Sequence, residues 1–419
     1  MNTASTQKKI IPVLIGADLN CYNVARAFHE AYGVVSHAFG RYEISATMAS
    51  RIIKFHRVPE LDTDTVFLSE MQRFAKEHKG EDTAMILVGC TDDYVNLIAR
   101  NRATLEGDFV VPYNPASLMD ELQSKARFYE YCDKHGILYP KTTVLHSKED
   151  VKSDVFSEEA LGFSYPIIVK PSSSVVYWKH PFDGMHKVYV AQDPKEAEDI
   201  CHTIYASGYD DEMLLQDMIP GNDSHMYVLT AYAGQDKKVK MMCLGHVLLE
   251  EHTPKGRGNH AAILTECNPA LCEGIRAFLE EIGYVGFANF DIKFDERDGT
   301  YRAFEINLRQ GRSNFYVTAS GENIARYLVG DHITHDLGDT CKLVDTDSFW
   351  ASIPKSIVWK YTNNDALIKR AKAVVKAGGG HSSLWYKYDL KANPKRLFYV
   401  AAAQLRHFKK FKVYCKDYK

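Results

Sequence analysis

One stretch of this 419-residue chain, Gly286 to Asn314, constrains the fold more than any other. Its two halves alternate apolar and polar side chains, and this period of two predicts a pair of strands that each bury one face. The apolar positions are even-numbered: Phe290, Ile292, Phe294, Phe304, Ile306 and Leu308. For the buried faces to coincide, the connecting loop must hold an odd number of residues. A three-residue loop, Arg297 to Gly299, with a left-handed Gly299, meets that condition.

The polar face of this predicted hairpin carries side chains typical of metal and phosphate sites. In the register above, Asp291 lies opposite Glu305, and Asn307 and Arg309 follow on the same face. Carboxylate and amide oxygens suit Mg²⁺, or Mn²⁺, and a guanidinium binds phosphate or carboxylate in bidentate fashion. A solvated polar face is the alternative, although such a face more usually carries Lys, Thr and Glu. We therefore predict Asp291, Glu305 and Asn307 as metal ligands and Arg309 as a ligand of phosphate or carboxylate.

The N-terminal part of the chain repeats a strand followed by a helix. Apolar runs at Ile10–Ile15 and Met85–Gly89 read as buried strands, and Asn23–Tyr32 has helical spacing. This repetition predicts a doubly wound parallel sheet over residues 1–115, with ligands at the carboxyl ends of its strands. The loops at those ends, 18–23 and 91–93, are candidate substrate contacts, or else ordinary turns and helix caps.

Beyond Pro112 the pattern changes to a helix, Leu118 to His135, followed by short and mostly antiparallel strands, which is α+β organisation. The whole chain is thus expected to combine α/β and α+β parts. We predict four segments: an N-terminal α/β domain (1–115), a small lid (116–205), a catalytic segment (206–330) and a basic, partly helical C-terminal extension (331–419).

The charge of the chain is unevenly distributed. The total is −3, but residues 351–419 contain 16 Lys and Arg against three acidic residues, a balance of +13. The near-neutral total argues against an obligate nucleic-acid binder. The basic tail either packs on the other domains with its cations solvated, or binds an anionic partner such as a UDP-linked precursor or the inner membrane surface.

Cysteine usage and hydropathy predict a cytoplasmic protein. The nine cysteines are scattered and never form a CxxC pair, which favours free thiols in a reducing compartment. No uncharged apolar stretch reaches the roughly 20 residues that span a bilayer.

Several motifs, taken in order, resemble those of the ATP-grasp superfamily. The segment AFEINLRQGRSN, with Asp291 fourteen positions before Glu305, resembles its metal-binding end. Lys125 in SKARFYEYCDKHGILYP and Lys170 in YPIIVKPSSS resemble its two phosphate-binding lysines. In LLQDMIPGND, the residues that resemble the adenine-reading hinge and its acidic ribose ligand are Gln216, Asp217, Ile219 and Asp223.

The resemblance implies ATP and Mg²⁺ as cofactors, and activation of a carboxylate as an acyl phosphate that an amine then attacks. Ser172 and Ser173 would give donors to phosphate oxygens. Lys125 and Lys170 would bind the phosphates and Arg309 would neutralise the developing charge, which makes Lys170 and Arg309 catalytic residues. In HTPKGRGNHA, Arg257 is either an anchor for a substrate carboxylate or a solvated loop cation.

Within the superfamily, the start VLIGADLNCYNVARAFHEAYGV, the length and the basic tail resemble the D-aspartate ligases of peptidoglycan cross-bridge synthesis. That resemblance implies a small amino-acid substrate, D-aspartate, activated at its β-carboxylate. It also implies an amine acceptor, the lysine ε-amine of a UDP-linked muropeptide. The alternatives are a ligase that makes a dipeptide or other small amide, a biotin-carboxylase-type enzyme, and a non-catalytic ATP-binding regulatory protein.

Overall fold

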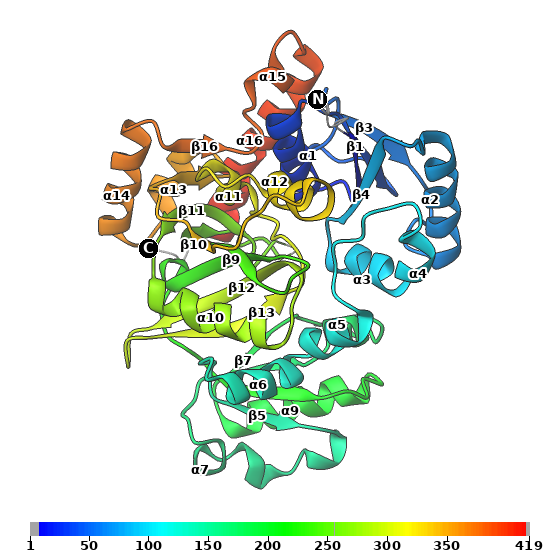
Figure 1. The fold of residues 1–419 in the computed structure, drawn as a ribbon. Coiled ribbons are helices and arrows are strands. Elements are labelled where there is room, and N and C mark those ends of the chain that lie inside the picture. The colour runs from blue at the N-terminus through cyan, green and yellow to red at the C-terminus, as the bar shows by residue number, and fades with distance from the viewer. Residues whose placement is uncertain (1–7, 255, 416–419) are drawn as a thin grey trace. The chain divides into compact units, whose positions relative to one another are not determined.

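A computed structural model describes residues 8–254 and 256–415. The chain forms two compact units (Figure 1), the first made of residues 1–119, 222–290 and 307–419, the second of residues 120–221 and 291–306. The predicted combination of α/β and α+β parts is confirmed. Because two units are a coarser division than the four expected segments, the boundaries of those segments stay a prediction.

The N-terminal part of the first unit is a four-stranded parallel sheet, as predicted, in the order β3-β2-β1-β4. Ile15 at the end of β1 pairs with Gly89 at the end of β4. The strand order reverses between these two strands, so their carboxyl ends form the kind of crevice in which α/β sheets bind ligands. The elements are β1 (Lys9–Ile15), α1 (Leu19–Tyr32), β2 (Ser36–Gly40), β3 (Ile53–Arg57), α2 (Asp64–His78), β4 (Thr83–Gly89), α3 (Asp92–Arg100) and α4 (Arg102–Leu105).

A larger mixed sheet has the order β13-β12-β9-β10-β11-β15-β16, with β14 paired to β10. The C-terminal extension supplies its last strands, which sequence analysis did not anticipate because strands of two or three residues have no detectable period. The elements are β9 (Met226–Ala233), β10 (Val239–Glu250), β11 (His260–Glu266), α10 (Pro269–Glu281), β12 (Gly286–Asp295), β13 (Thr300–Asn307), α11 (Phe315–Ala319), α12 (Ile324–Val329), β14 (Lys342–Leu343), β15 (Phe349–Ala351) and β16 (Gly380–Ser382). Short 3₁₀ and π turns lie at Asp223–His225 and Gly330–Thr334.

The hairpin of β12 and β13 carries the chain from one unit to the other, and its loop differs from the prediction. Four residues, Glu296 to Gly299, separate the strands instead of three. The Gly299 N–H donates to the Asp295 carbonyl at 2.9 Å, a bond from residue i+4 to residue i. The turn therefore begins at Asp295, one residue earlier than expected. Gly299 is left-handed, as predicted, with φ of 71°. With an even loop, the parity argument that set Asp291 directly opposite Glu305 no longer holds.

The second unit is built on a four-stranded antiparallel sheet, in the order β5-β8-β6-β7. The prediction of one helix over Leu118–His135 is wrong, because the chain forms two helices there. Ser124 is extended (φ −71°, ψ 121°) and its hydroxyl accepts the Arg127 N–H, so a new helix begins after it. The elements are α5 (Ala116–Gln123), α6 (Lys125–His135), β5 (Thr142–Leu145), α7 (Glu158–Leu161), β6 (Ile167–Pro171), α8 (Ser174–Tyr177), β7 (Tyr189–Ala191), α9 (Pro194–Ala206) and β8 (Met213–Asp217), with 3₁₀ turns at Lys148–Asp150 and Ser153–Phe156.

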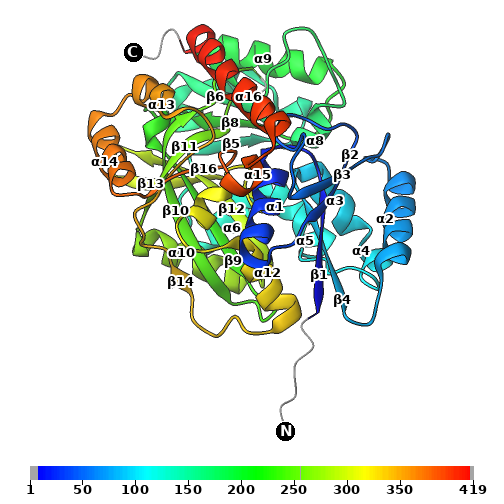
Figure 2. The ribbon, with the colours of Figure 1, turned by 90° about the horizontal axis from the view of Figure 1, so that it is seen from above.

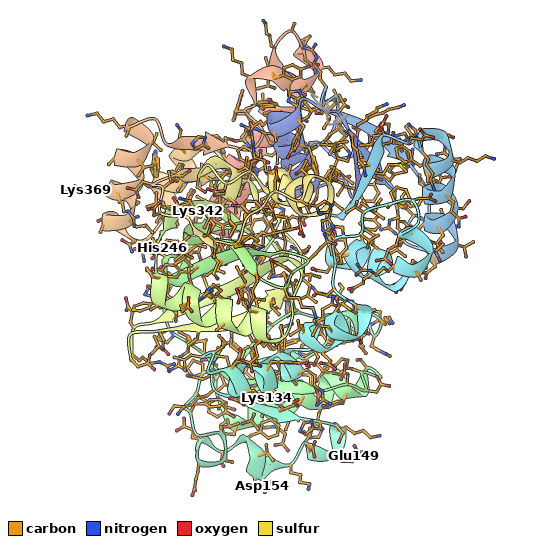
Figure 3. The ribbon with its side chains drawn as sticks, viewed as in Figure 1. Lys134, Glu149, Asp154, His246, Lys342 and Lys369 are labelled. Carbon is orange, nitrogen blue, oxygen red and sulfur yellow. The ribbon has the colours of Figure 1, made fainter. Side chains whose placement is uncertain are left out.

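Four helices follow in the basic extension: α13 (Lys355–Tyr361), α14 (Asp365–Lys376), α15 (Lys387–Leu390) and α16 (Pro394–Tyr414), the last a long surface helix (Figure 2). Charged side chains such as Lys134 of α6 and Lys369 of α14 are exposed (Figure 3). In the part of the chain that the structure describes, no helix combines the length and the apolar character that crossing a bilayer demands.

A fully buried ion pair joins α16 to α15, next to α1 and the loop before β3. Arg396 Nε lies 2.9 Å from Asp389 Oδ2, and neither side chain is exposed. Asp389 also accepts hydrogen bonds from the Tyr22 hydroxyl at 2.9 Å and the Arg51 N–H at 2.6 Å. Within the first unit, the tail therefore packs against α1 and the loop before β3 through a charge pair with several further hydrogen bonds, which is the arrangement that buried charges require.

Replacing Asp389 with asparagine is expected to lower the free energy of unfolding by about 3–5 kcal/mol, because Arg396 keeps its buried charge and loses its counter-ion. Thermal unfolding followed by circular dichroism measures this loss. Asp345→Asn, at an exposed position of the same extension, is the matched control and should leave the midpoint unchanged. An unchanged midpoint for Asp389→Asn would show that the pair does not anchor the helix.

Candidate active site

The sheet of the second unit brings Lys170 and Gln216 together. They lie on the neighbouring strands β6 and β8, where Ile168 pairs with Gln216. Lys170 Nζ donates to Gln216 Oε1 at 2.8 Å and to the hydroxyl of Tyr129, on α6, at 3.5 Å. Burial, together with the nearby charge of Lys125, lowers the pKa of Lys170 to about 7. Lys170 is thus a buried cation with neutral partners, ready to be paired with an anion.

Lys125 and Glu305 form the second part of this site. Lys125 is the first residue of α6, where a cation opposes the helix dipole, and its Nζ lies 3.3 Å from Glu305 Oε2 on β13. Burial alone would raise the pKa of Glu305, but the charges of Lys125, Lys187 and Lys170 hold it well below its usual range. Three lysines therefore act on one ionised carboxylate.

This charge balance fits the phosphates of a nucleotide and a divalent cation. A carboxylate that stays ionised is the hard oxygen donor that Mg²⁺ requires, and lysine side chains are suitable partners for a polyphosphate. Asp291, on β12, is partly buried in the same unit. Among the described residues, no cluster of three His, Cys, Asp or Glu side chains forms a metal site; the predicted set is of another kind, two carboxylates and one amide.

Ser172 and Ser173, the predicted phosphate donors, cap helices. Ser172 Oγ accepts the Ala126 N–H at 3.2 Å and lies 3.2 Å from Ser124 Oγ, at the first turn of α6. Ser173 Oγ accepts the Val176 N–H at 3.3 Å and so caps α8. Both hydroxyls are used by the protein, and their contact with phosphate stays a prediction.

The predicted adenine hinge is also engaged by neighbouring side chains. Gln216 Nε2 donates to the Tyr129 hydroxyl at 2.9 Å and to Thr142 Oγ1 at 2.7 Å. Asp217 receives two hydrogen bonds from Arg297, at 3.1 and 2.5 Å. Lys293 Nζ donates to the Ile219 carbonyl at 2.8 Å. These bonds hold the segment in place, and its contact with adenine stays a prediction.

In the first unit, Arg309 contacts the segment that follows the carboxyl end of β4. Its Nε lies 2.7 Å from Asp92 Oδ1, and its Nη2 donates to Asp92 Oδ2 at 2.9 Å. Asp92 begins α3, directly after β4, and Asn307 Oδ1 accepts from Arg309 Nη2 at 3.4 Å. Burial raises the pKa of Asp18, at the end of β1, while Arg312 and Arg309 lower it in part. The two predicted substrate loops thus meet an arginine-rich segment at the ends of their strands.

Those two loops also contain helix caps, which were the alternative interpretation. Asp18 Oδ1 accepts the Cys21 N–H at 3.2 Å, and Thr91 Oγ1 accepts the Tyr94 N–H at 3.4 Å, so both residues cap helices. Capping and substrate contact are compatible, because a cap uses one oxygen atom of a side chain.

Two further predicted residues lie in the first unit. Asp223 is buried, and its Oδ2 accepts the Glu250 N–H and lies 2.8 Å from His252 Nε2. Arg257 is exposed in the turn after Glu251, where its N–H donates to the Thr253 carbonyl. Neither placement tests the predicted contacts with ribose or with a substrate carboxylate.

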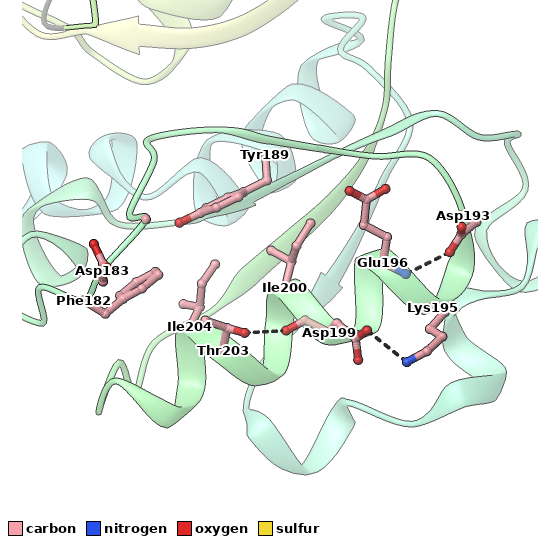
Figure 4. A pocket seen from close by; sticks show the side chains of 11 residues that line it. Phe182, Asp183, Tyr189, Asp193, Lys195, Glu196, Asp199, Ile200, Thr203 and Ile204 are labelled. Carbon is pink, nitrogen blue, oxygen red and sulfur yellow. Dashed lines mark hydrogen bonds and ion pairs between the residues drawn. The ribbon is translucent and has the colours of Figure 1, made fainter.

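A pocket in the second unit lies apart from the predicted residues (Figure 4). It borders α9 and holds about 470 Å³. Several of its charged groups contact one another: Asp193 caps α9 through the Glu196 N–H, and Lys195 pairs with Asp199 at 3.0 Å. This pocket is therefore a feature of the helix surface, and no function is assigned to it.

Several site residues escaped sequence analysis. The spacing of Tyr129 is that of an aromatic residue in a helix core, and Lys187 is a single lysine in a loop. Neither residue therefore belongs to a sequence pattern that indicates a functional site. Asn20 was only part of a loop: its Nδ2 donates to the Cys90 carbonyl at 2.9 Å, and its Oδ1 accepts from Asn314 at 2.8 Å. Gln310 Nε2 donates to the Gly89 carbonyl at 3.0 Å. These amides tie the segment after β13 to the ends of β1 and β4.

The comparisons with known proteins agree with this architecture. No family model matches the chain. A D-aspartate ligase of Enterococcus faecium (strain Aus0004) is 38% identical over 394 residues, 93% of each chain. The chain belongs to the D-aspartate ligase family. Its members are ATP-dependent ligases of the ATP-grasp fold, so the predicted family, fold and enzyme class are confirmed.

Solved structures share the fold at low identity. The L-amino acid ligase of Bacillus licheniformis has a TM-score of 0.54 at 13% identity, covering 77% of this chain and 74% of that one. The biotin carboxylase domain of the Hydrogenobacter thermophilus 2-oxoglutarate carboxylase, solved with MgADP, ADP and bicarbonate, has a TM-score of 0.56 at 14% identity, covering 76% and 69%.

Proposed function

We propose that this carboxylate–amine ligase joins the β-carboxylate of D-aspartate to the lysine ε-amine of a UDP-linked peptidoglycan precursor. The proposal is supported by the E. faecium relative, named D-aspartate ligase. The observation that carries the ATP half of the reaction is the pairing of Lys125 Nζ with Glu305 Oε2 at 3.3 Å, in a unit where Lys170 and Lys187 also hold the pKa of Glu305 below its usual range.

In the proposed reaction, the substrate β-carboxylate attacks the γ-phosphorus of ATP, which forms an acyl phosphate and releases ADP. The acceptor amine then attacks the acyl carbon, and phosphate leaves as the amide forms. Lys125 and Lys170 hold the phosphates and offset their charge, and Arg309 stabilises the charge that develops at the acyl group. Mg²⁺, held by Asp291, Glu305 and Asn307, would polarise the phosphoryl oxygens.

Remaining parts of the site follow the same logic. Ser172 and Ser173 are proposed to donate to phosphate oxygens, while Gln216, Asp217 and Ile219 border the adenine and Asp223 the ribose. Arg257 is proposed to bind a substrate carboxylate, since an exposed guanidinium in a loop can reach a ligand without leaving a buried charge unpaired.

The proposal is tested by ADP release from the full-length protein with Mg²⁺ and a matrix of D- and L-amino acids, with and without a UDP-muropeptide. We expect ADP release to need D-aspartate and to accelerate with the muropeptide. Release with other pairs of amino acids would instead identify a dipeptide ligase, and dependence on bicarbonate a carboxylase. The absence of ADP release under every condition would identify a non-catalytic ATP-binding protein.

A further inference from the structure

The long helix α16 has one face that the protein covers and one that it does not. Its buried side chains are Arg396, Val400, Gln404 and Phe411. On the other side, large apolar side chains are exposed: Leu397 (44%), Phe398 (68%), Leu405 (67%) and Phe408 (48%). Residues 397, 401, 405 and 408 follow the three- and four-residue spacing of a single helical stripe. The helix therefore presents a continuous apolar stripe to solvent.

The charged side chains of α16 have one sign. No Asp or Glu occurs in residues 394–414. Five exposed cations are present: Lys395, Arg406, Lys409, Lys410 and Lys412. None of them forms an ion pair with any residue in the ranges 8–254 and 256–415. A helix that only needed solubility would usually mix both signs at four-residue spacing, so this pattern indicates an anionic partner.

Residues 385–391, just before α16, include the short helix α15 and also expose aromatic and basic side chains. Trp385 and Tyr388 are about half exposed, at 48% and 49%. Lys387 and Lys391 are exposed beside them. Amphipathic aromatic rings next to lysines are typical of side chains at a membrane–water interface.

We propose that this face, formed by α16 and residues 385–391, docks on an anionic lipid bilayer. The apolar stripe would enter the boundary between headgroups and acyl chains, and the cations would bind the acidic headgroups. A soluble anion such as a nucleotide would pair with the lysines but would leave the exposed Leu and Phe side chains in water. The buried Arg396–Asp389 pair holds the helix on the first unit, so the face is present before any membrane is bound.

The test is sedimentation of the full-length protein with vesicles of phosphatidylcholine, alone or mixed with phosphatidylglycerol. We expect recovery only with the anionic vesicles, and a decrease in recovery with added salt. Two double variants separate the contributions: Leu405→Ser with Phe408→Ser, and Lys409→Gln with Lys412→Gln. Each should weaken vesicle binding by about tenfold or more. Val35→Ser with Lys76→Gln, exposed positions elsewhere in the first unit, is the matched control and should bind normally.

Both double variants should keep the thermal midpoint and the rate of ADP formation with soluble substrates, which separates this proposal from the enzymatic one. Equal recovery with neutral and anionic vesicles would overturn it. So would undiminished binding by the serine variant. A third result would also contradict the lipid proposal: wild-type protein that does not bind vesicles but self-associates, with a serine variant that is monomeric by light scattering. In that case a second copy of the chain covers the face.

Discussion

Replacing Glu305 with glutamine is expected to reduce Mg²⁺-dependent ADP formation by about a thousandfold, the scale of losing a central electrostatic contact in a transition state. The substitution keeps the shape of the side chain but removes the ionised oxygen that the three lysines stabilise. Initial rates of ADP release at saturating ATP measure the effect. The matched control is Glu296→Gln, an exposed carboxylate in the loop of the same hairpin, which should keep full activity.

The dependence on Mg²⁺ distinguishes a metal ligand from a residue that only pairs with Lys125. If Glu305 binds the metal, the variant should need more Mg²⁺ and should recover part of its rate as the concentration rises. A variant that retains turnover would contradict the metal assignment. A variant that loses turnover but has an unchanged Mg²⁺ dependence would restrict Glu305 to positioning Lys125, 3.3 Å away.

Replacing Lys170 with methionine is expected to lower kcat/KM for ATP by about a hundredfold, because the phosphates lose a buried cation whose geometry β6 and Gln216 determine. The wild-type enzyme should also show a pH effect. The pKa of Lys170 is about 7 in the unliganded protein, so its cationic fraction falls as the pH rises above 7, and the affinity for ATP should fall with it.

The control for this experiment is Lys134→Met, an exposed lysine in the last turn of α6. It should match the wild type in rate and in pH dependence. The pH range from about 6 to 9 covers the titration of Lys170 in the wild type. Within this range, the ATP affinity of the Lys170→Met variant should be nearly independent of pH. A variant with wild-type affinity, or one with the same decrease above pH 7, would show that Lys170 does not contact the phosphates.

Parts of the fold were predictable because they follow from local periodicity. The apolar run of β1 and the alternation along β12 and β13 each identify a strand, since burial imposes a period on the residues involved. The break at Ser124 and the fourth residue of the Glu296–Gly299 loop were not predictable, because each depends on one capping or turn hydrogen bond. An apolar pattern that extends over ten residues does not change when a loop is longer by one residue or when a helix breaks at one residue.

The candidate site divides in the same way. Lys170 stands out because a lysine ends an apolar strand before a proline, and Glu305 because it alternates with apolar neighbours. What surrounds them comes from distant parts of the chain: the Tyr129 hydroxyl contacts Gln216 across 87 positions, and the influence of Lys187 on Glu305 is electrostatic. Such pairings are set by packing of whole elements and leave no mark in a single sequence.

The central claim, that this chain activates D-aspartate with ATP, is tested most directly by trapping the intermediate. Full-length protein is incubated with ATP, Mg²⁺, D-aspartate and hydroxylamine, without any amine acceptor, and the hydroxamate is measured beside ADP. We predict β-aspartyl hydroxamate in proportion to ADP, from D-aspartate and not from L-aspartate, and none from Glu305→Gln. ADP formed with no hydroxamate from any amino acid, or only in the presence of bicarbonate, would contradict the account.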